Sequence, residues 1–153
     1  MAYEYDDQNI FAKILRAEIP NTTVMETEHC LAFRDINPLL PEHILIIPKG
    51  PYVNYDHFAL LATDIEIVDF TRTIGKVCDA VGVSPDQGNG YRIISNAGEH
   101  GIQEVPHLHV HILGGASSGR MIQPSHAPLG FATKYVDDHP YHHHNEYGKY
   151  LLL

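Results

Sequence analysis

The stretch VPHLHVHILGG, residues 105–115, sets three histidines in strict alternation with apolar residues. Successive side chains of a β-strand leave it on opposite faces, so this alternation predicts a half-buried strand. The apolar side chains of the run are expected to point into the core: Leu108, Val110 and Ile112. The opposite, exposed face then carries the imidazoles of His107, His109 and His111. Three imidazoles on one exposed face are hard to explain as packing and indicate a functional site.

Spacing along this strand leaves more than one kind of site open. His107 and His111 lie about 13 Å apart along an extended strand, too far for all three histidines to bind one zinc ion at about 2.1 Å. A pair such as His107 and His109 could bind a metal if another strand supplied a third ligand. The alternative is that one imidazole is a nucleophile or an acid–base group, which its neighbours orient. Structural coincidence is the third interpretation.

Length and composition restrict the class of protein. A chain of 153 residues, 44% of them hydrophobic, is expected to form one globular domain. The formal net charge of −9 argues against a nucleic-acid surface, although a mononucleotide needs only a local pocket of donors. We expect no leader, because the start MAYEYDDQN is acidic and polar, and no membrane span, because apolar runs are short. Cys30 and Cys78 have no CxxC spacing, which favours reduced thiols in the cytoplasm.

Periodicity and turn signals predict the other elements. Asn9 is the expected cap of a short helix, and one long helix is expected to begin at Asp56 and to stop at Gly82. The order of elements predicts an α+β domain with a mainly antiparallel sheet of about five strands and helices to one side. The expected helices cover 9–18 and 56–81, and the expected strands cover 22–26, 30–35, 43–48, 91–95 and the histidine run.

The run from His107 to Leu113 resembles the signature of the histidine triad (HIT) superfamily of nucleotide-binding hydrolases and transferases, His-apolar-His-apolar-His-apolar-apolar. Its continuation into two glycines is similar to the histidine triad nucleotide-binding branch, whose members are mostly purine nucleoside phosphoramidases. FAKILRAEIP at 11–20 and DINPLLPEHILIIPK at 35–49 are also typical of the family. The resemblance implies an HIT-like fold with one long and one short helix, whose sheet continues across a symmetric homodimer.

The resemblance also implies a catalytic set. His109 would attack the α-phosphorus of a nucleotide to give a nucleotidyl-histidine, which water then hydrolyses to a nucleoside monophosphate. His111 would hydrogen-bond the phosphate and the bridging atom, while His107 and His43 would orient the others. No metal or other cofactor is required. The implied reaction is hydrolysis of the P–N bond of adenosine 5'-phosphoramidate-type substrates.

Substrate-binding residues follow from the same resemblance. Asp35 would accept hydrogen bonds from the ribose hydroxyls, and Asn96 would donate to a phosphate oxygen. The loop 97–101 would supply backbone N–H groups to the same anion. Near the N-terminus, core packing with secondary contact to the purine base is expected for Ile10, Phe11 and Ile14.

The end of this loop departs from the family pattern. Ile102 and Glu104 stand on either side of Gln103, where the branch commonly has Gly-Gln-Ser. We count both as substrate-binding positions. The carboxylate of Glu104 would repel the phosphate, assist proton transfer to a leaving amine, or point away and leave only its backbone N–H in the site.

Three other functions stay open. One is a dinucleoside polyphosphate hydrolase, one is a nucleotide-binding regulator with low turnover, and one is a zinc protein with His43, His107 and His109 as ligands. Residues 1–115 are expected to form the HIT domain, and 116–153 an extension in the same domain or at a dimer contact. Most of this extension is expected to be a solvated tail, although its histidines, His139 and His142–His144, could bind metal adventitiously.

Overall fold

The computed structural model describes residues 3–122, 143–144 and 150–151. The chain divides into two compact units, residues 1–119 and 120–153. The strands of the first unit are β1 (Thr23–Glu26), β2 (Cys30–Arg34), β3 (Glu42–Pro48), β4 (Tyr91–Ile94) and β5 (Val110–Gly114). Its helices are α1 (Ile10–Leu15), α2 (Tyr55–Leu61), α3 (Asp64–Ala80) and α4 (Pro85–Gly88).

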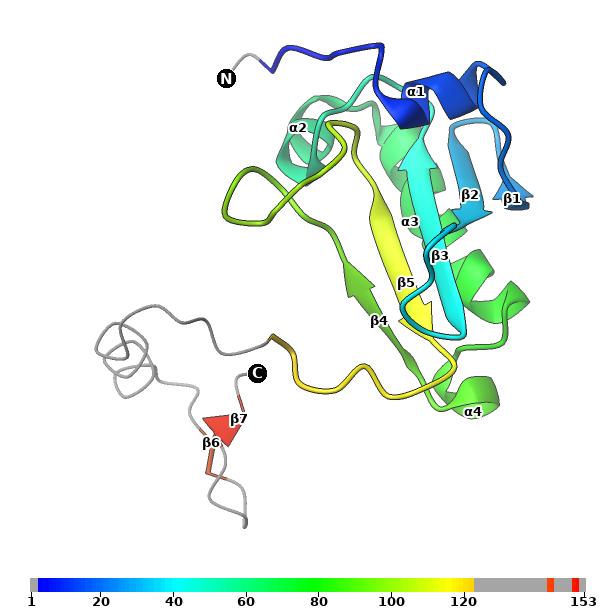
Figure 1. Ribbon diagram of the computed structural model, residues 1–153, viewed down its shortest axis with the longest axis vertical. Helices are drawn as coiled ribbons and strands as arrows, with labels where there is room; N and C mark the ends of the chain where they lie inside the picture. The colour runs from blue at the N-terminus through cyan, green and yellow to red at the C-terminus, as the bar shows by residue number, and fades with distance from the viewer. Residues whose placement is uncertain (1–2, 123–142, 145–149, 152–153) are drawn as a thin grey trace. The chain divides into compact units, whose positions relative to one another are not determined.

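The strands form one sheet in the order β1-β2-β3-β5-β4, and every neighbouring pair is antiparallel (Figure 1). The predicted α+β fold with about five antiparallel strands is confirmed. Leu45 of β3 stands opposite His111 of β5, and Ile46 stands opposite Val110. Directly opposed residues of an antiparallel pair share a face, so His111 lies on the face of Leu45 and Val110 on that of Ile46.

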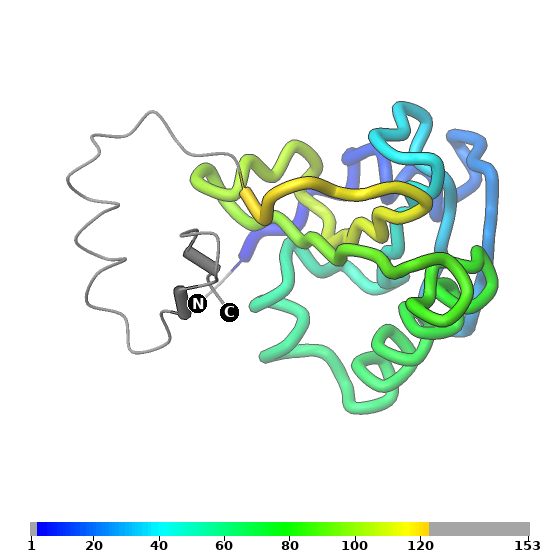
Figure 2. The backbone as a smooth tube through the Cα atoms, turned by 90° about the horizontal axis from the view of Figure 1, so that it is seen from below, coloured from blue at the N-terminus to red at the C-terminus, as the bar shows by residue number. Residues whose placement is uncertain are grey.

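Both faces of this sheet are buried, and different helices cover them. The core on the side of α2 and α3 consists of Cys30, Ala32, Ile44, Ile46, Phe58, Phe70, Val77, Cys78, Val83, Leu108, Val110 and Ile112. The core on the side of α1 consists of Phe11, Leu31, Phe33, Leu45 and Ile47. Figure 2 shows α1, in dark blue, and α3, in green, on opposite sides of the strands. The expectation that the helices lie to one side is therefore wrong for α1.

The region expected as one long helix, 56–81, forms two. Asn54, rather than Asp56, caps α2 through its side chain. A capping box then starts α3: the hydroxyl of Thr63 accepts the N–H of Glu66, and the carboxylate of Glu66 accepts the N–H of Thr63. Apolar residues keep a helical spacing through the break, so periodicity alone could not show it.

The short helix α1 has the cap expected for it. Oδ1 of Asn9 accepts the N–H groups of Phe11 and Ala12 at 3.0 and 2.9 Å. The helix ends earlier than expected, and Ala17 follows it with a positive φ of 59°. Such a left-handed residue is a common way to terminate a helix.

In the second unit the structure describes β6 (His143–His144), which pairs antiparallel with β7 (Tyr150–Leu151). The other histidines named in the tail, His139 and His142, lie outside the described residues. The boundary between an HIT domain and an extension at residue 115 stays a prediction. In the described part of the chain, no helix has the length and apolar character needed to span a membrane.

Candidate active site

The triad histidines enter β5 from its N-terminal side and do not lie on one long strand. β5 begins at Val110, so His107 and His109 belong to the segment that leads into it. The two residues are buried, with 0% and 6% of their surface exposed, while His111 is partly exposed. The expected exposed row of imidazoles is therefore wrong.

The cover over the histidines comes from α1. Phe11 meets the ring of His109 edge-on at a centroid distance of 5.0 Å and that of His107 at 6.3 Å. The opposite side of the run behaves as predicted, because its apolar residues belong to the core under α2 and α3: Leu108, Val110 and Ile112. Alternation thus assigned the faces correctly, but it could not show that a separate helix covers the second one.

One ring nitrogen of His109 is hydrogen-bonded and the other is free. Nδ1 lies 2.7 Å from the backbone carbonyl oxygen of His107. A carbonyl only accepts, so Nδ1 carries the proton and Nε2 keeps its lone pair. Nε2 has no hydrogen-bond partner among the described residues, and the buried nitrogen and oxygen atoms that lack one there belong to His29 and Thr73. Nε2 of His109 therefore reaches solvent, although most of the ring is buried.

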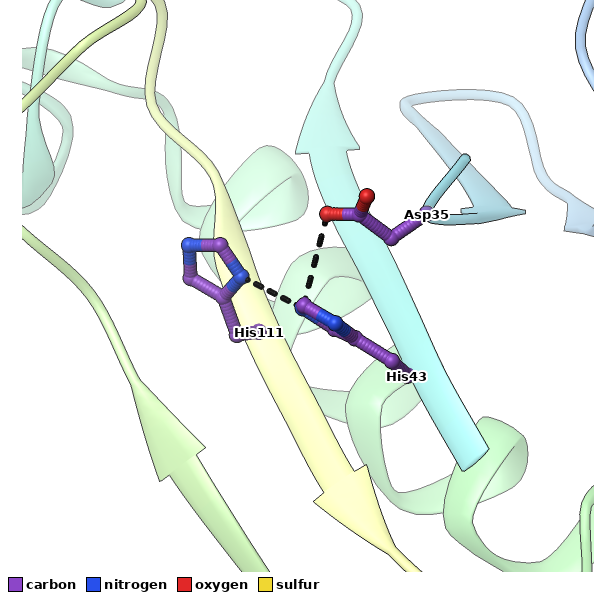
Figure 3. Close-up of side chains that lie close together, drawn as sticks. All are labelled: Asp35, His43 and His111. Atoms are coloured by element: carbon purple, nitrogen blue, oxygen red, sulfur yellow. Dashed lines mark hydrogen bonds and ion pairs between the residues drawn. The ribbon is translucent and has the colours of Figure 1, made fainter. Parts of the chain in front are cut away.

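Hydrogen bonds to His43 determine which ring nitrogen of His111 carries the proton (Figure 3). The backbone N–H of Leu39 donates to Nδ1 of His43 at 3.1 Å, so His43 carries its proton on Nε2. That nitrogen lies 2.9 Å from Nδ1 of His111 and 3.5 Å from a carboxylate oxygen of Asp35. Nδ1 of His111 therefore accepts, and its proton is on Nε2. Within the described residues this Nε2–H has no acceptor, which leaves it available to a bound anion.

His107 anchors the segment that leads into β5 to the end of β3. Its Nε2–H donates to the backbone carbonyl of Pro48 at 2.8 Å. Its own carbonyl accepts the proton of His109 Nδ1. Through these two contacts, His107 connects the end of β3 to the ring of His109, whose Nε2 is free.

Burial keeps these imidazoles neutral. Removal from water lowers the pKa of His107 to about 4. Burial and the neighbouring imidazoles of His109 and His43 lower the pKa of His111 to about 4. Burial also lowers the pKa of His109 and of His43, and the carboxylate of Asp35 opposes the shift at both. A nucleophile needs its lone pair, and a lowered pKa preserves that of His109 at neutral pH.

Asp35 comes directly after β2, and Asn96 comes after β4, the strand that pairs with β5. Oδ1 of Asp35 accepts the N–H of Asn37 at 2.8 Å, and the carboxylate keeps further acceptor sites for ribose hydroxyls. Asn96 follows β4, and its amide has no hydrogen-bond partner among the described residues. Ser95, just before it, donates its hydroxyl to the carbonyl of His109 at 3.1 Å, which holds Asn96 next to the residue with the free nitrogen.

The loop before the triad is held by Gln103, a residue that sequence reasoning missed. Its side-chain amide donates to the carbonyls of Val53 and Val105 at 2.6 and 2.9 Å. The N–H groups of Ile102 and Gln103 donate to carbonyls earlier in the loop, both at 3.1 Å. These two amides are therefore not directed at an anion. The side chain of Ile102 is 73% exposed.

Glu104 lies at the solvent-facing edge of the site. Its side chain is exposed, and its negative charge acts to raise the pKa of His109 against the effect of burial. The carboxylate is therefore within electrostatic reach of the free nitrogen.

Apolar side chains border the site on the side of α1. Ile10 is 50% exposed, Ile14 is partly buried, and Phe11 is buried against the histidines. Sequence reasoning missed Ile36 and Leu39, which are 90% and 78% exposed in the turn after Asp35. Turn residues follow no periodic pattern, so only exposure of large apolar side chains next to a polar site could have indicated them.

The structure brings together one set of groups with the chemistry of a metal site. The side chains of Asp35, His43 and His111 offer ligand atoms that all lie within 4.8 Å of one another, and this is the single such group among the described residues. The set His43, His107 and His109 is thus not assembled as the zinc alternative requires. In the group of Asp35, His43 and His111, the facing nitrogens of the two histidines are already joined by a hydrogen bond. The geometry therefore favours a hydrogen-bonded pair over a metal site.

Comparison with known proteins identifies the family of the chain. The family model described as HIT domain matches residues 16–118. An uncharacterized 13.2 kDa HIT-like protein of Azospirillum brasilense is 53% identical over 80% of this chain and 98% of its own length. The purine nucleoside phosphoramidase of Escherichia coli K12 is 40% identical over 76% of this chain and 94% of its own.

A solved structure gives the same result for the fold. An HIT family hydrolase from Clostridium thermocellum superposes with a TM-score of 0.65 at 35% identity, covering 77% of this chain and 99% of the other. The arrangement of histidines, the family match and these relatives support hydrolysis of a nucleotide as the general activity. The chain belongs to the HIT family.

Proposed function

We propose that the chain is a metal-independent purine nucleoside phosphoramidase, which cleaves the P–N bond of adenosine 5'-phosphoramidate-type substrates and releases a nucleoside monophosphate. The observation that carries this proposal is the unprotonated, solvent-reaching Nε2 of His109, whose Nδ1–H is bound to the His107 carbonyl. The relative from E. coli that is named for this activity supports the same substrate class.

In the first step, the lone pair on Nε2 of His109 forms a bond to the α-phosphorus and the P–N bond breaks. The electron pair of that bond leaves on the nitrogen, which takes the proton from Nε2 of His111. The Nε2–H of His43, which is hydrogen-bonded to Nδ1 of His111, stabilises the His111 ring as it loses this proton. The covalent intermediate is a nucleotidyl-imidazolium, whose Nδ1–H stays on the His107 carbonyl.

In the second step, water attacks the same phosphorus and the bond to His109 breaks. The proton of the water returns to His111, and His109 leaves as a neutral imidazole with its original tautomer. The sum of both steps is phosphoramidate plus water to amine plus nucleoside monophosphate. Each group is thereby restored for the next turnover.

Recognition of the nucleotide uses the groups around the histidines. The amide of Asn96 would donate to a non-bridging phosphate oxygen, and Asp35 would accept from the ribose. Exposed apolar side chains at Ile10 and Ile36 suit a purine ring, because they lose contact with water when the base binds. We place the reaction in the cytoplasm, which the two free, buried cysteines support.

The experiment is a single-turnover reaction of adenosine 5'-phosphoramidate with chelator-treated protein. Wild type should release AMP and pass through an acid-labile adenylyl group on a histidine, without added metal. His109→Ala should lose about 10⁴-fold or more in rate, since the covalent route is then closed. Undiminished AMP release by this variant, or loss of wild-type turnover after chelation, would contradict the proposal.

Two alternatives are tested by the same preparation. If diadenosine polyphosphates are turned over faster than the phosphoramidate, the chain is a dinucleoside polyphosphate hydrolase. If nucleotide binds but no adenylyl-histidine forms, it is a nucleotide-binding regulator. The exposed carboxylate of Glu104 near the nucleophile favours the phosphoramidase, because it repels anionic leaving groups more than amines.

A further inference from the structure

The segment before α1 reaches into the site through one tyrosine. The hydroxyl of Tyr5 lies 2.5 Å from Nδ1 of His107. The two rings meet edge-on, with centroids 5.5 Å apart and planes at 68°. Residue 5 lies ahead of the segment 16–118 that the family model matches, so this contact lies outside it.

The direction of this hydrogen bond is determined by the other side of the ring. Nε2 of His107 lies 2.8 Å from the carbonyl oxygen of Pro48, so Nε2 carries the proton and donates. Nδ1 is then an acceptor, and the Tyr5 hydroxyl must donate to it. Burial raises the pKa of Tyr5, which keeps the phenol protonated as this donor requires.

A chain of two hydrogen bonds therefore runs from Tyr5 to the nucleophile. The phenol fixes the fully buried ring of His107, and the carbonyl of His107 fixes the proton of His109 Nδ1. A simple packing role would need only the aromatic ring, and Phe would supply that. The hydroxyl is what satisfies Nδ1, which has no other partner among the described residues.

We propose that Tyr5 is a positioning residue for the His109 nucleophile, which acts by holding the ring and carbonyl of His107 in place. The inference rests on the proposed function, because it assigns Tyr5 a part in nucleotidyl transfer to His109. Tyr5 itself does not touch the reacting atoms.

The segment around Tyr5 has anchors of its own, so removal of one hydroxyl should not release it. The side-chain amide of Asn9 donates to the carbonyl of Asp6 at 2.7 Å, and Arg16 donates to that of Asp7 at 2.8 Å. Tyr3 contacts α2 through a hydrogen bond to Asp56. Tyr3 thus offers a matched control, a second tyrosine of the same segment whose hydroxyl bonds away from the triad.

The test compares Tyr5→Phe with Tyr3→Phe in the full chain, by steady-state kinetics with adenosine 5'-phosphoramidate and by ¹⁵N spectra of the imidazoles. Tyr5→Phe should lower kcat about ten-fold, the loss expected for one hydrogen bond, with KM within about two-fold of wild type. The Nδ1 resonance of His107, identified by its absence in His107→Gln, should move toward that of an unbonded nitrogen. Tyr3→Phe should leave kcat and this resonance unchanged.

The outcomes separate this inference from the proposed function. A wild-type protein without turnover would end the proposed function and the positioning role of Tyr5 with it. Wild-type turnover that Tyr5→Phe retains in full, or loses equally with Tyr3→Phe, would overturn the role of Tyr5 alone. A Tyr5→Phe protein with reduced kcat but an unchanged His107 resonance would also overturn it, since the effect would not pass through His107. Far-ultraviolet circular dichroism of each variant checks that the chain is folded.

Discussion

At the scale of single residues, the site depends on which nitrogen of each histidine carries the proton. Neutral imidazole has one donor and one acceptor, and backbone groups decide which is which. The N–H of Leu39 determines the tautomer of His43. The carbonyl of Pro48 determines that of His107, and the carbonyl of His107 determines that of His109. The result presents a lone pair on His109 and a proton on His111, which is the pairing that attack on phosphorus and departure of a leaving group require.

Glu104 should control which leaving groups are accepted. Replacing it with Ser removes a negative charge near His109, so substrates with an anionic leaving group should gain about five-fold in kcat/KM. Substrates that release a neutral amine should change less than two-fold. The measurement compares diadenosine polyphosphate with adenosine 5'-phosphoramidate at low ionic strength, and the gain should shrink as salt is added.

The matched control for this prediction is Glu99→Ser. Glu99 is an exposed carboxylate in the same loop. The charges that raise the pKa of His109 against the effect of burial are those of Asp35 and Glu104, not that of Glu99. Glu99→Ser should therefore leave the ratio of the two kcat/KM values unchanged. If Glu104→Ser changed kcat/KM equally for both substrates, the charge of Glu104 would not act on the leaving group.

Alternation in the sequence correctly predicted the inward residues of the triad run, but it could not predict the protonation of the histidines. Each tautomer depends on a group that is distant in sequence, such as Pro48 for His107. The link to Tyr5 spans 102 positions, and no local pattern marks it. Pairings of this kind follow only from the folded chain.

At the scale of elements, β4 is an edge strand of the sheet and carries exposed apolar residues. Among the strands that the structure describes, β4 pairs with β5 on one side only, and Tyr91 and Ile93 are 43% and 45% exposed. An unprotected apolar edge is a surface on which another strand can pair. We propose that a second copy of this chain pairs there, which extends the sheet across a homodimer.

Ile93→Lys should disrupt this pairing, because a lysine on an edge strand opposes apolar contact and strand addition. Wild type should have the mass of two chains by light scattering at micromolar concentration, and the variant that of one. Thr23→Lys on β1, the opposite edge of the same sheet, is the matched control and should keep the mass of two chains. A wild-type mass of one chain would contradict the proposed dimer.

The strands could be predicted more accurately than the helices. Alternating and continuous apolar runs identified β1 to β5, because each strand buries at least one face. The break between α2 and α3 depends on a capping box at Thr63, a local signal that the continuous apolar pattern hid. The position of α1 on the second face depends on packing against Phe33 and Leu45, which periodicity within α1 does not specify.

At the scale of the whole molecule, the buried histidines should make the protein sensitive to mild acid. The pKa of His107 falls from its ordinary 6.5 to about 4 on folding, and that of His111 falls to about 4. Between these values the unfolded chain binds more protons than the folded chain, so the free energy of unfolding decreases as the pH is lowered from 6.5 to 4. For His107, which is fully buried, the shift corresponds to roughly 3 kcal/mol.

Urea unfolding at a series of pH values between 7 and 4 measures this effect. His107→Gln should be less stable than wild type at pH 7, yet its free energy of unfolding should fall less steeply toward pH 4. His100→Gln, at an exposed histidine, should give a slope equal to that of wild type. Glu66 and Asp69 contribute to the slope only at the acidic end of this range, because hydrogen bonds lower their pKa from the ordinary values of 4.5 and 3.8 and their stabilisation is lost as the pH falls below those values. Parallel slopes for wild type and His107→Gln would mean that His107 is not buried as a neutral ring.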